Sequence, residues 1–153
     1  MVKKKKLSKN VQTVIDILQD EVDGNVSSAL KKVTKDYTMT WVNQAKNGKL
    51  FPTEKINTGQ DINEIYAIKG RQYDIKNIAE SDNLVMIELI ESYPDSKTKK
   101  VYRTPLVLVL EIKGGKIRTG RHYLDPSLSH KFLTKAEVKK AYKKTSGSLL
   151  VIK

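Results

Sequence analysis

The first third of the chain carries apolar residues at helical spacing. Apolar side chains recur every three or four residues over 11–22 and again over 26–33, which is the pattern of helices that bury one face. Ser8 or Asn10 can cap the first helix, and an Asp-Gly-Asn sequence separates it from the second. The pattern therefore predicts two amphipathic helices, of which the second ends near Asp36.

The central sequence has a β pattern. The run from Tyr37 to Val42 is β-prone, and the sequence over 59–66 allows a short third helix before the chain turns at Gly70. Beyond Gly70, long β-prone runs alternate with turn signals, which predicts successive antiparallel hairpins. The four predicted strands cover 71–80, 83–93, 100–113 and 116–125.

The third of these strands is apolar without interruption over 106–110. Strands of this kind usually have both faces covered. We therefore expect the helices on one face, and either the C-terminal segment or a partner chain on the other. The sequence thus predicts a homodimer formed through the sheet.

The C-terminal segment begins with a helix signal. Thr134 and Glu137 have the spacing of a capping box, and an apolar run follows at 149–152. A chain of 153 residues with 39% hydrophobic residues is the usual size of one domain. The predicted organisation is a basic tail, an α+β domain and a lysine-rich C-terminal helix with its tail. These parts cover 1–10, 11–130 and 131–153.

The net charge of +12 is concentrated at the two ends of the chain. Residues 1–10 contain five Lys and no acid, residues 131–153 contain seven Lys and one Glu, and +1 remains for residues 11–130. Solvated ends that aid solubility explain this distribution. Contact of the lysine tails with nucleic acid or another polyanion is the alternative, and the sequence leaves both open.

The sequence contains no Cys, which excludes disulfides and thiolate chemistry and fits a reducing compartment. It also shows no apolar stretch typical of a signal peptide or of a membrane span. We therefore expect a cytoplasmic protein that makes no contact with a membrane.

A local motif carries a resemblance to a known family. Gly-Lys-Ile at 115–117 is followed by Arg-x-Tyr-x-Asp at 121–125, which resembles the last strand of SnoaL-like proteins in the nuclear-transport-factor-two-like (NTF2-like) superfamily. The order of predicted elements over 11–130 is similar to the same fold. The resemblance implies an α+β, cystatin-like cone. In this fold a curved, mostly antiparallel sheet packs against two or three N-terminal helices, and here a C-terminal helix follows.

Three enzyme types of this superfamily use acids in the cone. Trp41 and Leu108 align with positions where ketosteroid isomerases and polyketide cyclases carry such acids. Limonene-epoxide hydrolase is matched better, because its Tyr-x-Asn resembles Trp41-Val42-Asn43 and its final acid resembles Asp125. Its Arg-x-Asp motif aligns with a Met-Ile-Glu sequence that ends at Glu88, so that an acid is kept and the Arg is lost.

The last predicted strand supplies the main candidate site. Strand alternation places Arg121, Tyr123 and Asp125 on one face, which we expect to line the cone. Asp125 is the candidate general base, and the alternative is that it braces the turn that follows. Glu88 is a second catalytic candidate if its strand face is the cone. Otherwise it meets solvent or a partner.

Three residues of the first strand complete the predicted site. Tyr37 and Trp41 are expected to line the cone, and Asn43 could orient a ligand, although an Asn at a strand end often forms a turn. Neither His122 nor His130 belongs to a spaced set of metal ligands, and no phosphate-binding glycine loop occurs. We therefore expect neither a metal nor a cofactor.

Two functions follow from this reading. The first is binding of a small, mostly apolar organic molecule in the cone, with acid-base turnover by Asp125 as an open question. The second is a non-catalytic interaction module with a filled cone, whose basic tails bind an anionic partner such as nucleic acid. An open cavity with polar groups pointing inward favours the first function, and a cone packed with its own apolar side chains favours the second.

Overall fold

The computed structural model describes residues 7–43, 45–56, 58, 63, 67–129, 131–143 and 148–153. Two N-terminal helices, α1 (Lys9–Asp23) and α2 (Val26–Lys32), are followed by a sheet. The long strands are β1 (Val33–Trp41), β5 (Gln72–Ser81), β6 (Leu84–Pro94), β7 (Val101–Lys113) and β8 (Lys116–Leu124). The shorter elements are β2 (Ala45–Lys46), β3 (Lys49–Leu50), β4 (Thr53–Lys55), α4 (Lys135–Ala141) and β9 (Leu150–Ile152).

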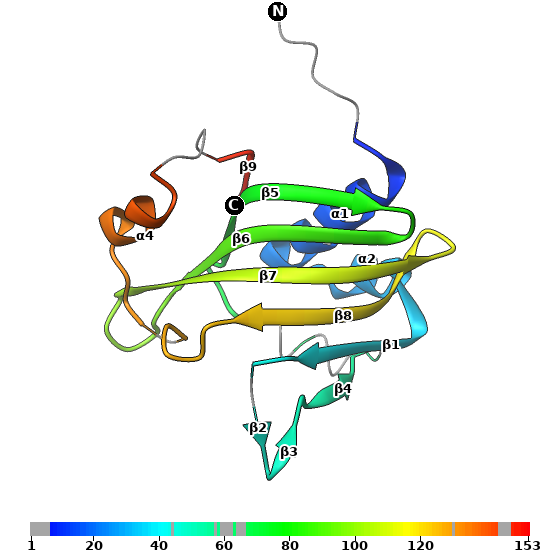
Figure 1. Ribbon diagram of the computed structural model, residues 1–153, viewed down its shortest axis with the longest axis horizontal. Helices are drawn as coiled ribbons and strands as arrows, with labels where there is room; N and C mark the ends of the chain where they lie inside the picture. The colour runs from blue at the N-terminus through cyan, green and yellow to red at the C-terminus, as the bar shows by residue number, and fades with distance from the viewer. Residues whose placement is uncertain are drawn as a thin grey trace, which may run out of the picture.

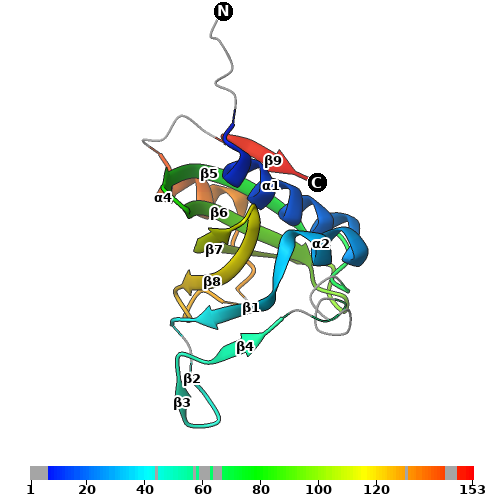
Figure 2. The same ribbon diagram turned by 90° about the vertical axis from the view of Figure 1, so that its right-hand side faces the viewer.

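The main sheet has seven strands in the order β4-β1-β8-β7-β6-β5-β9. All neighbouring pairs are antiparallel except β1 and β8, which run parallel. Helices α1 and α2 lie along the concave face of the curved sheet, and α4 lies on the other side (Figures 1 and 2). The predicted α+β cone, with a mostly antiparallel sheet, N-terminal helices and a C-terminal helix, is confirmed.

Helix α1 forms where the periodicity predicts it. The Ser8 side chain accepts a hydrogen bond from the Val11 backbone N–H at 3.1 Å, and Gly24 ends the helix in the left-handed conformation with φ 69°. The side chains at the predicted apolar positions Val11, Val14 and Leu18 are buried against the sheet.

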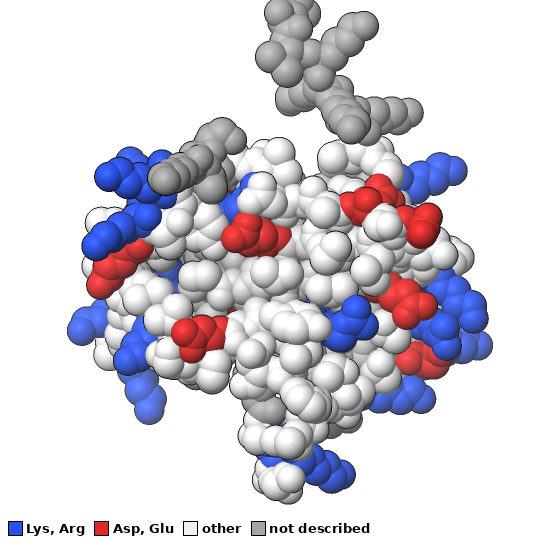
Figure 3. All heavy atoms as spheres, in the orientation of Figure 1, with Lys and Arg blue, Asp and Glu red and all other residues white. Residues whose placement is uncertain are grey.

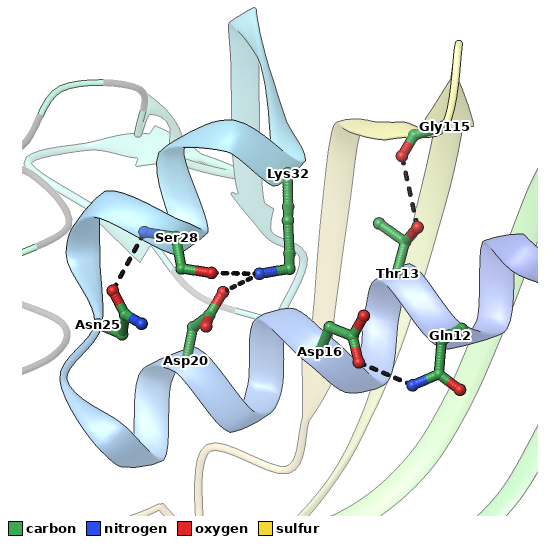
Figure 4. Close-up of polar contacts among 8 residues, drawn as sticks. All are labelled: Gln12, Thr13, Asp16, Asp20, Asn25, Ser28, Lys32 and Gly115. Atoms are coloured by element: carbon green, nitrogen blue, oxygen red, sulfur yellow. Dashed lines mark hydrogen bonds and ion pairs between the residues drawn. The ribbon is translucent and has the colours of Figure 1, made fainter.

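Polar contacts fix α1 against its neighbours (Figure 4). The Lys32 ammonium group of α2 lies between the Asp20 carboxylate of α1 and the Ser28 hydroxyl. The Thr13 hydroxyl donates to the Gly115 carbonyl oxygen at 3.4 Å, in the turn between β7 and β8. These contacts hold α1 over the sheet and so define one wall of the cone.

Two boundaries differ from the sequence prediction. The second helix ends at Lys32, and Val33 already belongs to β1, because the β-branched pair Val33-Thr34 favours extended backbone. The predicted third helix over 59–66 falls almost entirely outside the described residues.

A β-bulge interrupts the alternation of β8. The register shifts between Glu111 and Ile112 of β7, and again on the β1 side of the strand. As a result Ile117 and Gly120 are both buried on the concave face, although strict alternation would place them on opposite faces. The predicted faces of the last strand are therefore wrong from Thr119 onward.

The C-terminal segment covers part of the convex face. Its capping box is confirmed, because Thr134 and Glu137 exchange side-chain and backbone hydrogen bonds. The Lys76 ammonium group of β5 lies 5.4 Å from the centre of the Tyr142 ring, and β9 adds three residues to the edge of β5. The C-terminal segment therefore covers part of this face. The homodimer through the sheet stays a prediction.

Candidate functional site

A cavity of about 450 Å³ lies between α1 and the concave face of the sheet. Its walls are mostly apolar and come from the helix, from β1 and from the central strands. The apolar lining includes Leu18, Met39, Trp41, Leu106, Leu108 and Ile117. The cone is therefore open, and its volume is within the range of roughly 300–1,000 Å³ that is usual for small-molecule sites.

A cluster of charged side chains lies in the wall of this cavity. Arg71, which precedes β5, donates from Nη1 to Glu21 Oε1 of α1 at 3.2 Å, and its Nε atom lies 2.9 Å from Glu91 Oε1 of β6 in an ion pair. The Tyr73 hydroxyl donates to Glu21 Oε2 at 2.8 Å. We call Glu21, Arg71, Tyr73 and Glu91 the acid–arginine cluster, and all four residues line the cavity.

The carboxyl group of Glu21 titrates near neutrality. Burial raises its pKa from 4.5 to about 7, and it outweighs the lowering by the Arg71 charge and the Tyr73 hydrogen bond. The Glu91 charge raises this pKa further. The side chain is 19% exposed, and because it lines the cavity, this exposed surface can face a ligand. A carboxyl in this position can take or give a proton at neutral pH.

Arg71 and Tyr73 of the cluster keep fixed protonation states. Arg71 is 5% exposed and remains a cation. Burial, followed by the Glu21 charge, raises the pKa of Tyr73 and of the neighbouring lining residue Tyr37 well above the usual value. Both phenols therefore remain protonated, and Tyr73 acts as a fixed hydrogen-bond donor to Glu21.

His122 is a further polar residue of the lining. Burial lowers the pKa of its imidazole from 6.5 to about 4, so that the ring is neutral at neutral pH. Its Nδ1 atom is buried, and no described protein atom is its hydrogen-bond partner. A neutral imidazole can both donate and accept a hydrogen bond, and His122 can therefore orient a polar group of a ligand.

The predicted site residues separate into two groups. Tyr37 and Trp41 line the cavity, as expected from the sequence, and their role in ligand binding stays a prediction. Asn43, Glu88 and Tyr123 instead line a shallow hollow on the convex face. Arg121 lies on β8 opposite Val109 and lines neither the cavity nor the hollow.

Asp125 lies in the shallow hollow and outside the cone. Its Oδ1 atom accepts hydrogen bonds from the Ser127 backbone N–H at 2.8 Å and from the Ser127 hydroxyl at 2.7 Å. These bonds lower the pKa of Asp125. The expectation that Asp125 faces the cone is wrong, because the bulge in β8 exchanges the faces beyond it. Its hydrogen bonds are those of a residue that braces a turn.

The acid–arginine cluster was not predicted from the sequence. Arg71 and Tyr73 follow their partner Glu21 by 50 and 52 residues in the sequence. No local pattern around any of these residues indicates a site. One signal was present: Glu21 follows Leu18 by three residues and so lies on the apolar face of α1. An acid on a buried helix face needs a partner or a function.

Among the described residues, no three His, Asp or Glu side chains are grouped closely enough to hold a metal ion. Within the same residues, no helix has the length and apolar character needed to cross a membrane.

Comparison with known proteins identifies the fold. No protein-family model and no curated protein matches the chain by sequence. Among solved structures, an LEH-like epoxide hydrolase from M. tuberculosis superposes with a TM-score of 0.62 at 16% identity, covering 88% of this chain and 96% of that one. A protein with a ketosteroid isomerase-like fold from Catenulispora acidiphila, in complex with trimethylamine, gives 0.60 at 15%, covering 75% and 86%.

An NTF2-like protein from Cytophaga hutchinsonii gives a TM-score of 0.60 at 14% identity, covering 81% of this chain and 96% of that one. At these identities the similarity establishes the fold. The chain has the NTF2-like cone fold, and the resemblance found in its sequence is confirmed at that level.

Proposed function

We propose that the cone cavity binds a small, mostly apolar organic molecule and that Glu21 exchanges a proton with it. The observation that carries this proposal is an open, apolar cavity of about 450 Å³ whose wall holds a carboxyl group with a pKa of about 7. An open cavity also argues against the alternative function, which requires a cone filled by its own side chains.

The acid–arginine cluster supports a chemical role for Glu21. In its ionised form the carboxylate can remove a proton from water or from a carbon acid, and in its protonated form it can protonate a departing oxygen. Arg71 stabilises the ionised form, and the Tyr73 hydroxyl at 2.8 Å fixes the orientation of the carboxyl group. Neutral His122 supplies a second polar contact for the ligand.

Two of the similar structures support the binding of a small molecule. One of them is an epoxide hydrolase, and another is a complex with trimethylamine. Because these proteins share 15–16% identity with this chain, they support the class of ligand and leave its identity open.

Trp41 gives a direct assay for binding in the cavity. It is the only Trp of the chain and lines the cavity, so a bound molecule should change its fluorescence. A library of small apolar compounds is titrated against the wild type and against Leu108→Phe, which fills part of the cavity. Val109→Phe is the matched control, because Val109 is the next residue of the same strand and faces the opposite side.

Glu21→Gln tests the proton transfer. The amide keeps a hydrogen-bond acceptor for Tyr73 but cannot titrate near neutrality. For a compound that binds the wild type, the affinity should vary with pH around the Glu21 pKa of about 7, and in the variant it should not. Binding that Leu108→Phe leaves unchanged would exclude the cavity as the site, and equal pH dependence in both proteins would exclude Glu21.

A further inference from the structure

An aromatic stack lies beside the turn between β6 and β7. The rings of Tyr93 and Tyr102 have centres 5.3 Å apart, and Phe132 stacks on Tyr102 at 4.4 Å with an interplanar angle of 18°. Phe132 is 40% exposed. None of the three residues lines the cone cavity. The outermost ring of the stack is thus a flat aromatic surface that solvent can reach.

The chain holds Phe132 in this position. Arg103 donates from Nη1 to the Leu133 carbonyl oxygen at 2.6 Å, and its backbone N–H donates to the Lys131 carbonyl oxygen at 3.5 Å. These bonds fix the residues on both sides of Phe132 to the start of β7. The exposed ring therefore needs little ordering before it can contact a ligand.

Exposed lysines occur in the two segments that carry the stack. Lys97, Lys99, Lys100 and Lys131 are exposed, and the Lys97 charge acts on the nearby Asp95 carboxylate. The Lys100 ammonium group lies 5.6 Å from the centre of the Phe132 ring. We call these four lysines, together with the three stacked rings, the aromatic–lysine surface.

The charge around this surface is strongly positive. The stacking of Phe132 on Tyr102 brings together residues 95–103 and 131–143. These two segments contain nine Lys or Arg and only two acids. Asp95 already accepts hydrogen bonds from Thr98, and Glu137 from Thr134. Figure 3 shows Lys and Arg side chains along the left edge of the molecule, over α4 and the β6–β7 turn. Charge that the sequence divides between two segments is thus gathered at one end of the sheet.

We propose that the aromatic–lysine surface binds single-stranded nucleic acid. A base stacks on the exposed Phe132 ring and extends the row of aromatic rings, while the lysines contact phosphates on either side of it. Stacked aromatic side chains next to a basic groove are the usual means of binding single strands without sequence preference. Lys100 lies over the Phe132 ring in the unbound protein and can move from there to a phosphate group.

The exposed ring favours a single strand over other polyanions. In a duplex the faces of the bases are covered by their neighbours, and heparin has no aromatic base to stack. This inference is independent of the function proposed for the cone, since the two sets of residues do not overlap.

The test measures binding of a fluorescein-labelled oligo(dT) of about 12 nucleotides by fluorescence anisotropy, beside a duplex of equal length, heparin and phosphatidylserine vesicles. Phe132→Leu keeps apolar packing on Tyr102 but removes the aromatic ring. It should weaken oligo(dT) binding about fivefold to a hundredfold, as expected for the loss of one stacked base, and leave heparin binding unchanged. A thermal melt confirms that the variant is folded.

The lysines are tested by a pair of charge-matched variants. Lys99→Gln/Lys100→Gln removes two charges at this surface, and Lys113→Gln/Lys116→Gln removes two exposed charges at the other end of β7. For oligo(dT), the slope of log Kd against log salt concentration should be smaller by about 1.4 in the Lys99/Lys100 variant than in the wild type. The Lys113/Lys116 variant should keep the wild-type slope. The proposal is overturned if the protein does not bind oligo(dT), or if it binds the duplex equally well or more tightly. It is also overturned if the two lysine variants weaken oligo(dT) binding equally, or if Phe132→Leu affects binding to vesicles and not to oligo(dT).

Discussion

Glu21 and His122 should have opposite effects on how stability depends on pH. The pKa of Glu21 is raised from 4.5 to about 7 on folding, so between these values the folded protein binds more protons than the unfolded chain. The free energy of unfolding therefore falls as pH rises through this window. At 1.36 kcal/mol for each unit of pKa, the loss is about 3 kcal/mol.

His122 acts in the other direction. Its pKa is lowered from 6.5 to about 4 on folding, so the unfolded chain binds more protons in this range, and the free energy of unfolding rises with pH by about 3 kcal/mol. The two contributions overlap between pH 4.5 and 6.5 and nearly cancel. The wild type should therefore show an almost flat stability profile over that range.

Glu21→Gln removes one of the two opposing contributions. The free energy of unfolding of this variant should rise by about 3 kcal/mol as the pH rises from about 4 to 6.5, because only the His122 contribution remains. For His122→Gln it should fall by a similar amount as the pH rises from 4.5 to about 7. The double variant should again have a flat profile. Urea unfolding followed by circular dichroism at several pH values gives these free energies. The surface acids Asp36, Asp95 and Glu137 have lowered pKa values and titrate alike in all four proteins. Parallel profiles for the wild type and Glu21→Gln would refute the raised pKa.

Three further predictions concern single residues. Arg71→Met should lower the free energy of unfolding by about 3–5 kcal/mol above the Glu21 pKa of about 7, because two carboxylates lose their shared cation. Below this pKa the loss should be smaller, and an equal loss at both pH values in urea unfolding would contradict the prediction. A Cβ on Gly120 would lie 2.7 Å from the Met39 methyl carbon, so Gly120→Ala should push Met39 into the cavity. This variant should lose about 1 kcal/mol of folding stability and show a smaller change of Trp41 fluorescence when a ligand is added. An unchanged fluorescence titration would exclude that contact. Asp125→Ala should lower the melting temperature and leave the Trp41 response unchanged, since Asp125 braces a turn, and lost binding with an unchanged melt would restore its predicted role in the site.

The sequence predicted the elements of the fold well and the faces of the last strand poorly. The four strands predicted beyond Gly70 begin and end within about one residue of their predicted bounds, because alternation and turn residues are local signals. The side that a residue faces depends on register, and the bulge near Thr119 depends on pairing with strands that are distant in sequence. A single inserted residue moved Arg121, Tyr123 and Asp125 to the convex face.

The cluster in the cone was hidden for a different reason. Glu21, Arg71 and Glu91 each have an ordinary local context, and their relation appears only when α1 crosses the start of β5 and the end of β6. His122 belongs to the motif that carried the resemblance, but the expected alternation assigned it to the wrong face. Tyr37 and Trp41 were placed correctly because they lie four residues apart on β1 and therefore share one face of that strand.

The short outer strands have a consequence for how molecules of this protein can associate. Both edges of the main sheet are formed by strands of three residues, β4 and β9. An exposed edge strand offers unpaired backbone groups to another chain and is a common starting point of aggregation. Here β4 pairs with residues 38–40 of β1 and β9 with residues 73–75 of β5, so each of these long strands is shielded over three residues. A homodimer formed through the convex face of the sheet, as the sequence predicts, would rest on side-chain contacts and would leave these edges unused.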